Sequence, residues 1–206
     1  MQVRLAEFDD LLAILAISNW AAINTAANFA LEPETLESWQ TEWRETNQMY
    51  PWFVAFNGES QIATTDPTHP QASSLEGRGS VVGFAKASPW KGRCAYAYSA
   101  EVTVFVHPDY HGHGIGKALY GRLIPTLKAQ GYQSLLAGIT QPNEASVRLH
   151  ESFGFQRVAL FERVGWKFDQ WHDVGYWELL LQGAATSPSP IIAVREAASR
   201  LELTAG

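Results

Sequence analysis

Hydrophobic and polar positions recur along this chain with two periods, one typical of helices and one typical of strands. A helical pattern begins behind Asp9 and Asp10, whose carboxylates suit the first turn of a helix. A second helix is predicted after Glu32-Pro33-Glu34, where Trp39 and Trp43 recur at helical spacing. Further helices are predicted at Gly114–Gln130, Glu144–Phe153 and Ile191–Leu203, and strands at Val3–Ala6, Trp52–Phe56, Ser80–Ala87, Ala100–Val106, Ser134–Ile139, Gln156–Val164 and Asp173–Leu181.

The order of these elements sets the fold class. After a first strand come two helices, three strands, a helix, a strand, a helix and two strands. Because helices lie both within and between runs of strands, the order predicts an α/β domain with a mixed sheet.

Two segments depart from the periodic pattern. Residues 61–79 are rich in Thr, Ser, Pro and Gly without apolar periodicity, which predicts an exposed insertion. Ser187-Pro188-Ser189-Pro190 reads as a linker before the weak last helix. We therefore expect a main domain over residues 1–183 and a linker with a C-terminal tail over 184–206.

Composition narrows the functional classes. The 206 residues are 46% hydrophobic, which is enough to form a core. A net charge of −6 gives no reason to expect a nucleic-acid partner. The single cysteine, Cys94, excludes a disulfide framework and a cysteine-rich zinc site. No apolar run is long enough for a membrane span and no signal peptide is evident, so we expect a cytoplasmic protein that acts on a small molecule.

The sharpest local motif is His111-Gly112-His113-Gly114-Ile115-Gly116, directly after a strand and at the start of a helix. Glycines let successive backbone N–H groups turn toward one point, and the helix N-terminus adds its positive dipole end, so the turn suits a pyrophosphate. Such a turn also serves as a plain tight connection. A Rossmann unit would place it after the first strand, and a P-loop would need a hydroxyl after Lys117, so neither nucleotide fold fits.

At these residues the chain resembles a known family. Val102–Gly116 resembles the acyl-CoA-binding motif of the GNAT acetyltransferases, a strand followed by Arg/Gln-x-x-Gly-x-Gly/Ala. The downstream helix of that superfamily is similar to Asn143-x-x-Ser146-x-x-Leu149-His150 followed by Phe153-Gly154-Phe155. Stretches resembling its phosphinothricin and methionine sulfoximine N-acetyltransferase branch are 50–55, 89–96, 100–101 and 171–177.

The resemblance implies a fold and a co-substrate site. The fold is a central, mostly antiparallel sheet with helices on both faces and a splayed strand pair that binds acyl-CoA. Residues implied to bind acetyl-CoA are Thr103, Val104, Phe105, Val106, His111, Gly112, His113, Gly114, Ile115, Gly116 and Asn143. His111 stands where the family usually has Arg or Gln, which weakens charge pairing but keeps a donor.

The resemblance also implies catalytic and substrate residues. Glu101 takes the position of the branch's catalytic glutamate, where it would accept the proton of the amine. His150 takes the position of a general acid or would share the role of base. Lys91 and Arg93, taken as alternating residues of an extended segment, would meet the acidic group of an amino-acid-like substrate.

The expected function is therefore direct transfer of an acetyl group from acetyl-CoA to the α-amine of a small amino-acid-like molecule. Another amine (an aminoglycoside, a polyamine or a peptide N-terminus) and a non-catalytic acyl-CoA-binding module are the alternatives. No metal is expected, because the neighbours His172 and Asp173 would face opposite sides of a strand. The branch forms homodimers, which implies a homodimer here, with 171–177 near the contact.

Overall fold

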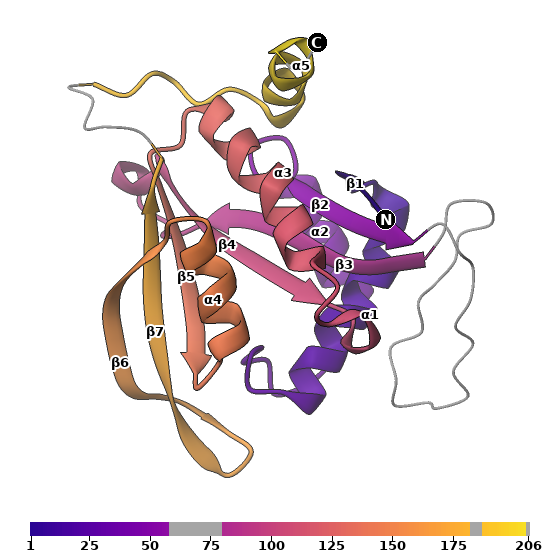
Figure 1. Ribbon diagram of the computed structural model, residues 1–206, viewed down its shortest axis with the longest axis vertical. Helices are drawn as coiled ribbons and strands as arrows, with labels where there is room; N and C mark the ends of the chain where they lie inside the picture. The colour runs from indigo at the N-terminus through magenta and orange to yellow at the C-terminus, as the bar shows by residue number, and fades with distance from the viewer. Residues whose placement is uncertain (58–79, 182–186, 205–206) are drawn as a thin grey trace. The chain divides into compact units, whose positions relative to one another are not determined.

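The structure, a computed structural model, describes residues 1–57, 80–181 and 187–204 (Figure 1). The predicted insertion at 61–79 and residues 184–186 of the predicted linker lie outside the described residues. The strands are β1 Gln2–Leu5, β2 Trp52–Asn57, β3 Ser80–Pro89, β4 Ser99–Val106, β5 Ser134–Gln141, β6 Gln156–Lys167 and β7 Gln170–Leu180. The α-helices are α1 Leu11–Asn24, α2 Leu36–Thr46, α3 Ile115–Gln130, α4 Glu144–Ser152 and α5 Val194–Thr204. The predicted order of elements is confirmed.

The strands form a mixed sheet in the order β1-β2-β3-β4-β5-β7-β6. Antiparallel ladders join β1 to β2, β2 to β3, β5 to β7 and β6 to β7, whereas β4 and β5 run parallel. The parallel ladder is confined to Ser99–Glu101 and Ser134–Leu136, at the start of both strands. A parallel pair joined only at its start is what the predicted splayed pair requires.

The chain divides into two compact units. Unit 1 comprises Met1–Asn47, Trp52–Lys86 and Val104–Leu123. Unit 2 comprises Gln48–Pro51, Ala87–Thr103 and Ile124–Gly206.

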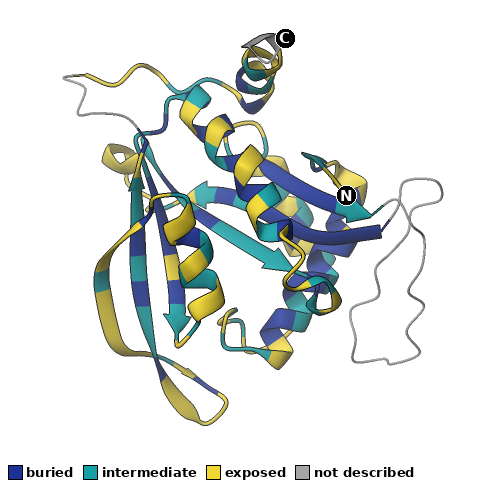
Figure 2. Ribbon diagram, in the orientation of Figure 1, coloured by how far each residue is buried: buried dark blue, intermediate teal, exposed yellow. Residues whose placement is uncertain are grey.

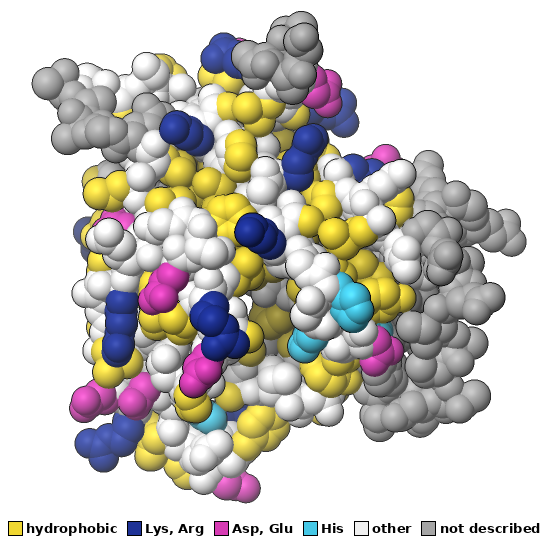
Figure 3. Space-filling model, viewed as in Figure 1, with side chains coloured by type: hydrophobic (Ala, Val, Ile, Leu, Met, Phe, Trp, Pro, Cys, Tyr) yellow, Lys and Arg dark blue, Asp and Glu magenta, His cyan; other side chains and the backbone are white. Residues whose placement is uncertain are grey.

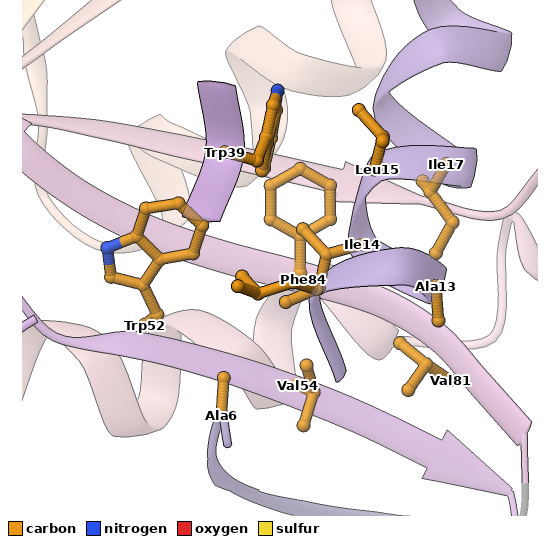
Figure 4. Close-up of a cluster of buried hydrophobic side chains, with 11 residues drawn as sticks. Ala6, Ala13, Ile14, Leu15, Ile17, Trp39, Trp52, Val54, Val81 and Phe84 are labelled. Carbon is orange, nitrogen blue, oxygen red and sulfur yellow. The ribbon is translucent and has the colours of Figure 1, made fainter. Parts of the chain in front are cut away.

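Unit 1 has helices on both faces of its strands. Val54 and Phe84, paired across β2 and β3, join a buried cluster with Ile14 of α1 and Trp39 of α2 (Figure 4). Gly83, next to Phe84, points the other way, and a Cβ there would lie 3.0 Å from Ile115 Cγ2 of α3. This alternation places α1 and α2 on one face and the start of α3 on the other.

The side chain of Lys86 packs against two tryptophan rings of this cluster. Lys86 Nζ lies 4.7 Å from the ring centroid of Trp39 and 4.4 Å from that of Trp52, and it donates to Glu42 Oε1 at 2.6 Å. Trp43 packs edge-on against Trp52 at 5.4 Å. These three tryptophans are therefore structural.

The two N-terminal helices begin with polar contacts. Asp10 lies at the start of α1, as predicted. It is buried, binds Arg4 at 2.6 Å and accepts from the Glu7 backbone N–H in a capping box, so local contacts fix the entry to α1. Helix α2 begins after Thr35, whose Oγ1 caps the Ser38 N–H. Pro33 lies outside the helix, because Thr35 provides the side-chain acceptor that an N-cap needs.

Unit 2 is built on β5, β7 and β6, with α4 bonded to β7. Trp177 Nε1 of β7 donates to Glu151 Oε1 of α4 at 3.2 Å. The β6–β7 hairpin is longer than predicted and turns through Phe168 and Asp169, both with positive φ. Neither residue is the glycine or asparagine that signals such a turn, so the pattern missed it. Figure 2 shows that most of β6 is exposed.

The C-terminal helix is docked onto unit 2. The Val194 N–H donates to the Gln48 carbonyl, and Gln130 Nε2 donates to the carbonyls of Met49 and Ile192. Ala197 is fully buried. The tail is thus tied down by backbone bonds that a hydrophobic pattern does not reveal.

The surface carries charges of both signs. On the face seen in Figure 3, basic and acidic side chains are interspersed. Among the described residues, no helix combines the length and apolarity that crossing a bilayer demands.

Candidate active site

Glu101 lies in unit 2 on β4, within the short parallel ladder, where it pairs with Leu136 of β5. It is half-buried. Its carboxylate is hydrogen-bonded to Tyr176 of β7 and interacts electrostatically with the positive charge of Lys91. The structure therefore gathers an acid, a phenol and an ammonium group around one point of unit 2.

The pKa of Glu101 is raised, because burial disfavours its charged form. The positive charge of Lys91 and the hydrogen bond from Tyr176 act in the opposite direction and limit the rise. A carboxylate with a raised pKa is a better proton acceptor than an ordinary glutamate, which suits it to take a proton from an ammonium group.

The segment that carries Lys91 and Arg93 is not extended. After β3 ends at Pro89 the chain bends, and Arg93 directly precedes the 3₁₀ helix Cys94–Tyr96 without a capping bond from its side chain. The argument that the two cations project to one side by strand alternation is therefore wrong. Lys91 is exposed and its Nζ lies 5.2 Å from the ring centroid of Trp90, which in turn packs edge-on against Tyr96.

His150 sits in the last turn of α4 and is buried, with only 3% of its surface exposed. Its Nδ1 lies 2.7 Å from the Ser146 carbonyl, and its ring packs edge-on against Phe155. Since a carbonyl only accepts, Nδ1 carries the proton, which makes Nε2 of the neutral ring an acceptor. Burial lowers the pKa of His150, although the bond to Ser146 partly offsets this. The geometry thus suits proton acceptance at Nε2 better than proton donation.

Asn143 is the N-cap of α4. Its Oδ1 accepts from the Ser146 N–H at 3.1 Å, which satisfies one of the open donors of the helix. The amide oxygen accepts in this cap, and the Nδ2 amino group is the side chain's hydrogen-bond donor.

The glycine turn lies in unit 1. Gly112 and Gly114 have φ values of +80° and +76°, and α3 begins directly after them at Ile115. The side chains of His111 and His113 and both glycines are exposed, whereas Ile115 is buried and anchors the helix. Left-handed glycines before a helix N-terminus are the features of an anion-binding turn.

The two histidines of the turn brace its backbone. His111 Nε2 lies 2.9 Å from the Val106 carbonyl, and His113 Nδ1 lies 3.0 Å from the His111 carbonyl. Both carbonyls accept, so both ring nitrogens donate. His111 therefore ties the turn to the end of β4.

The residues expected to bind the pantetheine arm are on β4. Thr103, Val104, Phe105 and Val106 are half-buried and follow the short ladder to β5. Phe105 also packs against the unit 1 core through Phe84, with ring centroids 5.7 Å apart.

Sequence reasoning missed Tyr176 and Gly138, which lie next to Glu101; a Cβ at Gly138 would be 3.6 Å from Glu101 Oε1. Tyr176 lies in the 171–177 stretch, but only the register of β5 with β7 reveals what it faces. His172 and Asp173 of the same stretch brace the hairpin, where His172 Nε2 lies 3.0 Å from the Lys167 carbonyl and Asp173 accepts from the Arg163 N–H. Within the described part of the chain, no group of three or more His, Cys, Asp or Glu is placed to hold a metal ion.

Comparison with known proteins connects these features to enzymes. The profile of the Acetyltransferase (GNAT) family matches residues 23–155. The phosphinothricin N-acetyltransferase of Streptomyces viridochromogenes is 34% identical over 86% of this chain and 86% of its own length. The L-methionine sulfoximine/L-methionine sulfone acetyltransferase of Salmonella typhimurium is 33% identical over 88% of this chain and 95% of its own.

A solved structure gives the same picture. The GNAT superfamily phosphinothricin acetyltransferase of Sinorhizobium meliloti, in complex with AcCoA, superposes with a TM-score of 0.79. It is 27% identical, and the match covers 93% of this chain and 94% of that chain.

Two glycines of unit 1 should respond to alanine with opposite signs. A Cβ meets nothing within 4 Å at either Gly114 or Gly121, so backbone conformation decides the outcome. Gly114→Ala should lower the free energy of unfolding by roughly 1–2 kcal/mol, because its φ is left-handed. Gly121→Ala, inside α3, should raise it by up to about 1 kcal/mol. Urea unfolding of both variants measures this, and equal signs would refute the left-handed turn.

Proposed function

Because the chain belongs to the acetyltransferase (GNAT) family, we propose that it moves an acetyl group from acetyl-CoA to the α-amine of a small amino-acid-like substrate of the phosphinothricin or methionine sulfoximine type. The observation that carries the proposal is the half-buried Glu101, with its raised pKa, beside Lys91 and Tyr176. The activities of the Streptomyces and Salmonella relatives support the substrate class. The AcCoA complex of the Sinorhizobium enzyme supports the donor.

The residues present fit acetyl-CoA as the co-substrate. The turn from His111 to Gly116 has the left-handed glycines and the helix N-terminus that a pyrophosphate needs. The backbone of Thr103–Val106 would bind the pantetheine arm, and Asn143 would add a hydrogen bond from Nδ2. His111 contributes by bracing the turn against the Val106 carbonyl rather than by a permanent charge.

Glu101 would act as the base. An α-amine is largely protonated near neutral pH and cannot attack until it loses a proton, which the ionised Glu101 would accept directly or through one water. The neutral nitrogen then attacks the thioester carbonyl carbon, and the backbone N–H of Val104 would stabilise the oxyanion. When the carbon–sulfur bond breaks, the second proton of the nitrogen goes to the leaving thiolate. His150, with Nε2 as an acceptor, would relay that proton.

Lys91 and Arg93 would select the substrate through its acidic group. Both are exposed cations on the bend that follows β3, and Lys91 acts on Glu101 electrostatically. They favour an anionic amino acid over an aminoglycoside or a polyamine. A non-catalytic acyl-CoA-binding module would have no use for Glu101.

A panel assay tests the proposed function. Thiol release from acetyl-CoA is measured with phosphinothricin, methionine sulfoximine, natural amino acids, an aminoglycoside, a polyamine and a peptide. We expect turnover with the acidic amino-acid analogues first. Turnover confined to the cationic amines would contradict the proposed amino-acid-like substrate. Binding of acetyl-CoA without any turnover would indicate a non-catalytic binding module.

Glu101→Gln should lower kcat/KM by about 10²–10⁴, the usual contribution of a general base. In the unsubstituted protein the rate should rise with pH as Glu101 loses its proton. Because burial raises its pKa, this acidic limb should lie above the range of an ordinary glutamate. Glu178→Gln is the matched control, since Glu178 of β7 is also half-buried and its Oε1 accepts from the Ser134 hydroxyl at 2.7 Å. Equal rates for Glu101→Gln and the control at every pH would remove Glu101 from the mechanism.

A homodimer is also proposed, as the resemblance implies. Within the 171–177 stretch, Trp171 is 56% exposed whereas Trp177 is buried, so only the hairpin end is available for a contact. Trp166 and Phe168 add exposed apolar surface beside it. Trp171→Ser should therefore shift sedimentation toward the monomer, while Leu12→Ser, at an equally exposed position of α1, should not. A monomeric unsubstituted protein would contradict the proposal.

A further inference from the structure

Three neighbouring strands of unit 2 place Glu101, Gly138 and Tyr176 on one face. Glu101 pairs with Leu136, which lies two residues before Gly138 on β5, and Gly138 pairs with Tyr176 on β7. Paired residues share a face, and so do residues two apart on a strand. The register alone thus aligns the carboxylate and the phenol across β5.

The missing side chain of Gly138 makes room for this arrangement. A Cβ at Gly138 would lie 3.3 Å from Tyr176 Cζ, 3.5 Å from its hydroxyl oxygen and 3.6 Å from Glu101 Oε1. The phenol therefore crosses β5 directly over the glycine to reach the carboxylate. Gly138 itself is exposed.

The Tyr176 ring also has a packing contact on the other side of β7, with the neighbouring strand β6. Phe161 of β6 packs edge-on against the Tyr176 ring, with centroids 5.7 Å apart and planes at 90°. The pKa of Tyr176 is raised by burial and further by the nearby Glu101 charge, so the hydroxyl keeps its proton and donates a hydrogen bond to the carboxylate.

We propose that Tyr176 is the positioning residue for Glu101: its hydroxyl, reaching across Gly138, donates to the carboxylate and fixes which oxygen faces the amine. This inference rests on the proposed function, in which Glu101 is the base. Tyr176 acts through Glu101. The charged group that acts on the Glu101 carboxylate is Lys91. A donated hydrogen bond stabilises the ionised form, so it keeps the base charged at lower pH than burial alone would allow.

The variant Tyr176→Phe tests this, because it keeps the ring and removes only the hydroxyl. We expect kcat to fall about tenfold, as for a lost hydrogen bond to a charged group. The acidic limb of the kcat/KM profile should move to higher pH, since the ionised Glu101 loses a donor. Tyr132→Phe is the matched control, because it removes another buried hydroxyl, which donates to the Met49 carbonyl from a position before the start of β5. It should leave the pH profile unchanged.

A second variant and a second readout complete the test. Gly138→Ala places a methyl against the ring and should reproduce the shift of Tyr176→Phe, and the double variant should shift little further. Carbon-13 NMR titration of the Glu101 carboxyl reports the interaction without turnover, and its midpoint should rise in both single variants. An unchanged Glu101 titration or an unchanged kcat in Tyr176→Phe would overturn the inference. A protein inert toward every amine but with a shifted titration would overturn the proposed function instead.

Discussion

The short parallel ladder between β4 and β5 is the constraint on which the candidate site depends. Its three residue pairs fix Glu101 beside Leu136, and the antiparallel register of β5 with β7 then brings Tyr176 to the same face. A ladder displaced by one residue would turn Glu101 to the opposite face of the sheet. Beyond the ladder, β4 continues through the residues assigned to the pantetheine arm. The strand that carries Glu101 thus also leads to the glycine turn.

Burial and hydrogen bonding give the ionisable groups of the site distinct properties. Glu101 is half-buried. Desolvation raises its pKa, and Lys91 and Tyr176 partly offset this rise. His150 is buried more deeply and is held neutral, with its tautomer fixed by the Ser146 carbonyl. His111 uses its ring to brace the turn backbone. Three residues assigned from one resemblance thus have three different physical roles.

The tryptophans of this chain have different structural roles. Trp39 and Trp52 contact the ammonium of Lys86 within the core of unit 1, and Trp43 packs against Trp52, while Trp171 lies on the exposed hairpin end. Their positions in the sequence do not separate these uses, because a large apolar side chain suits a core and an interface equally. The start of the last helix is bonded within unit 2 to the Gln48 carbonyl, and the preceding Ile192 is bonded to Gln130.

The sequence by itself determined the order of elements, the family and the glycine turn, because hydrophobic period, glycine spacing and ordered motifs are local properties of the chain. The structure and the family match confirm the predicted fold. Only the tertiary structure decided that Tyr176 and Gly138 belong with Glu101, that Lys91 and Arg93 lie on a bend, and that Phe168 and Asp169 make the hairpin turn. Each of these depends on strand register or on contacts between residues far apart in the sequence, which a one-dimensional pattern does not contain.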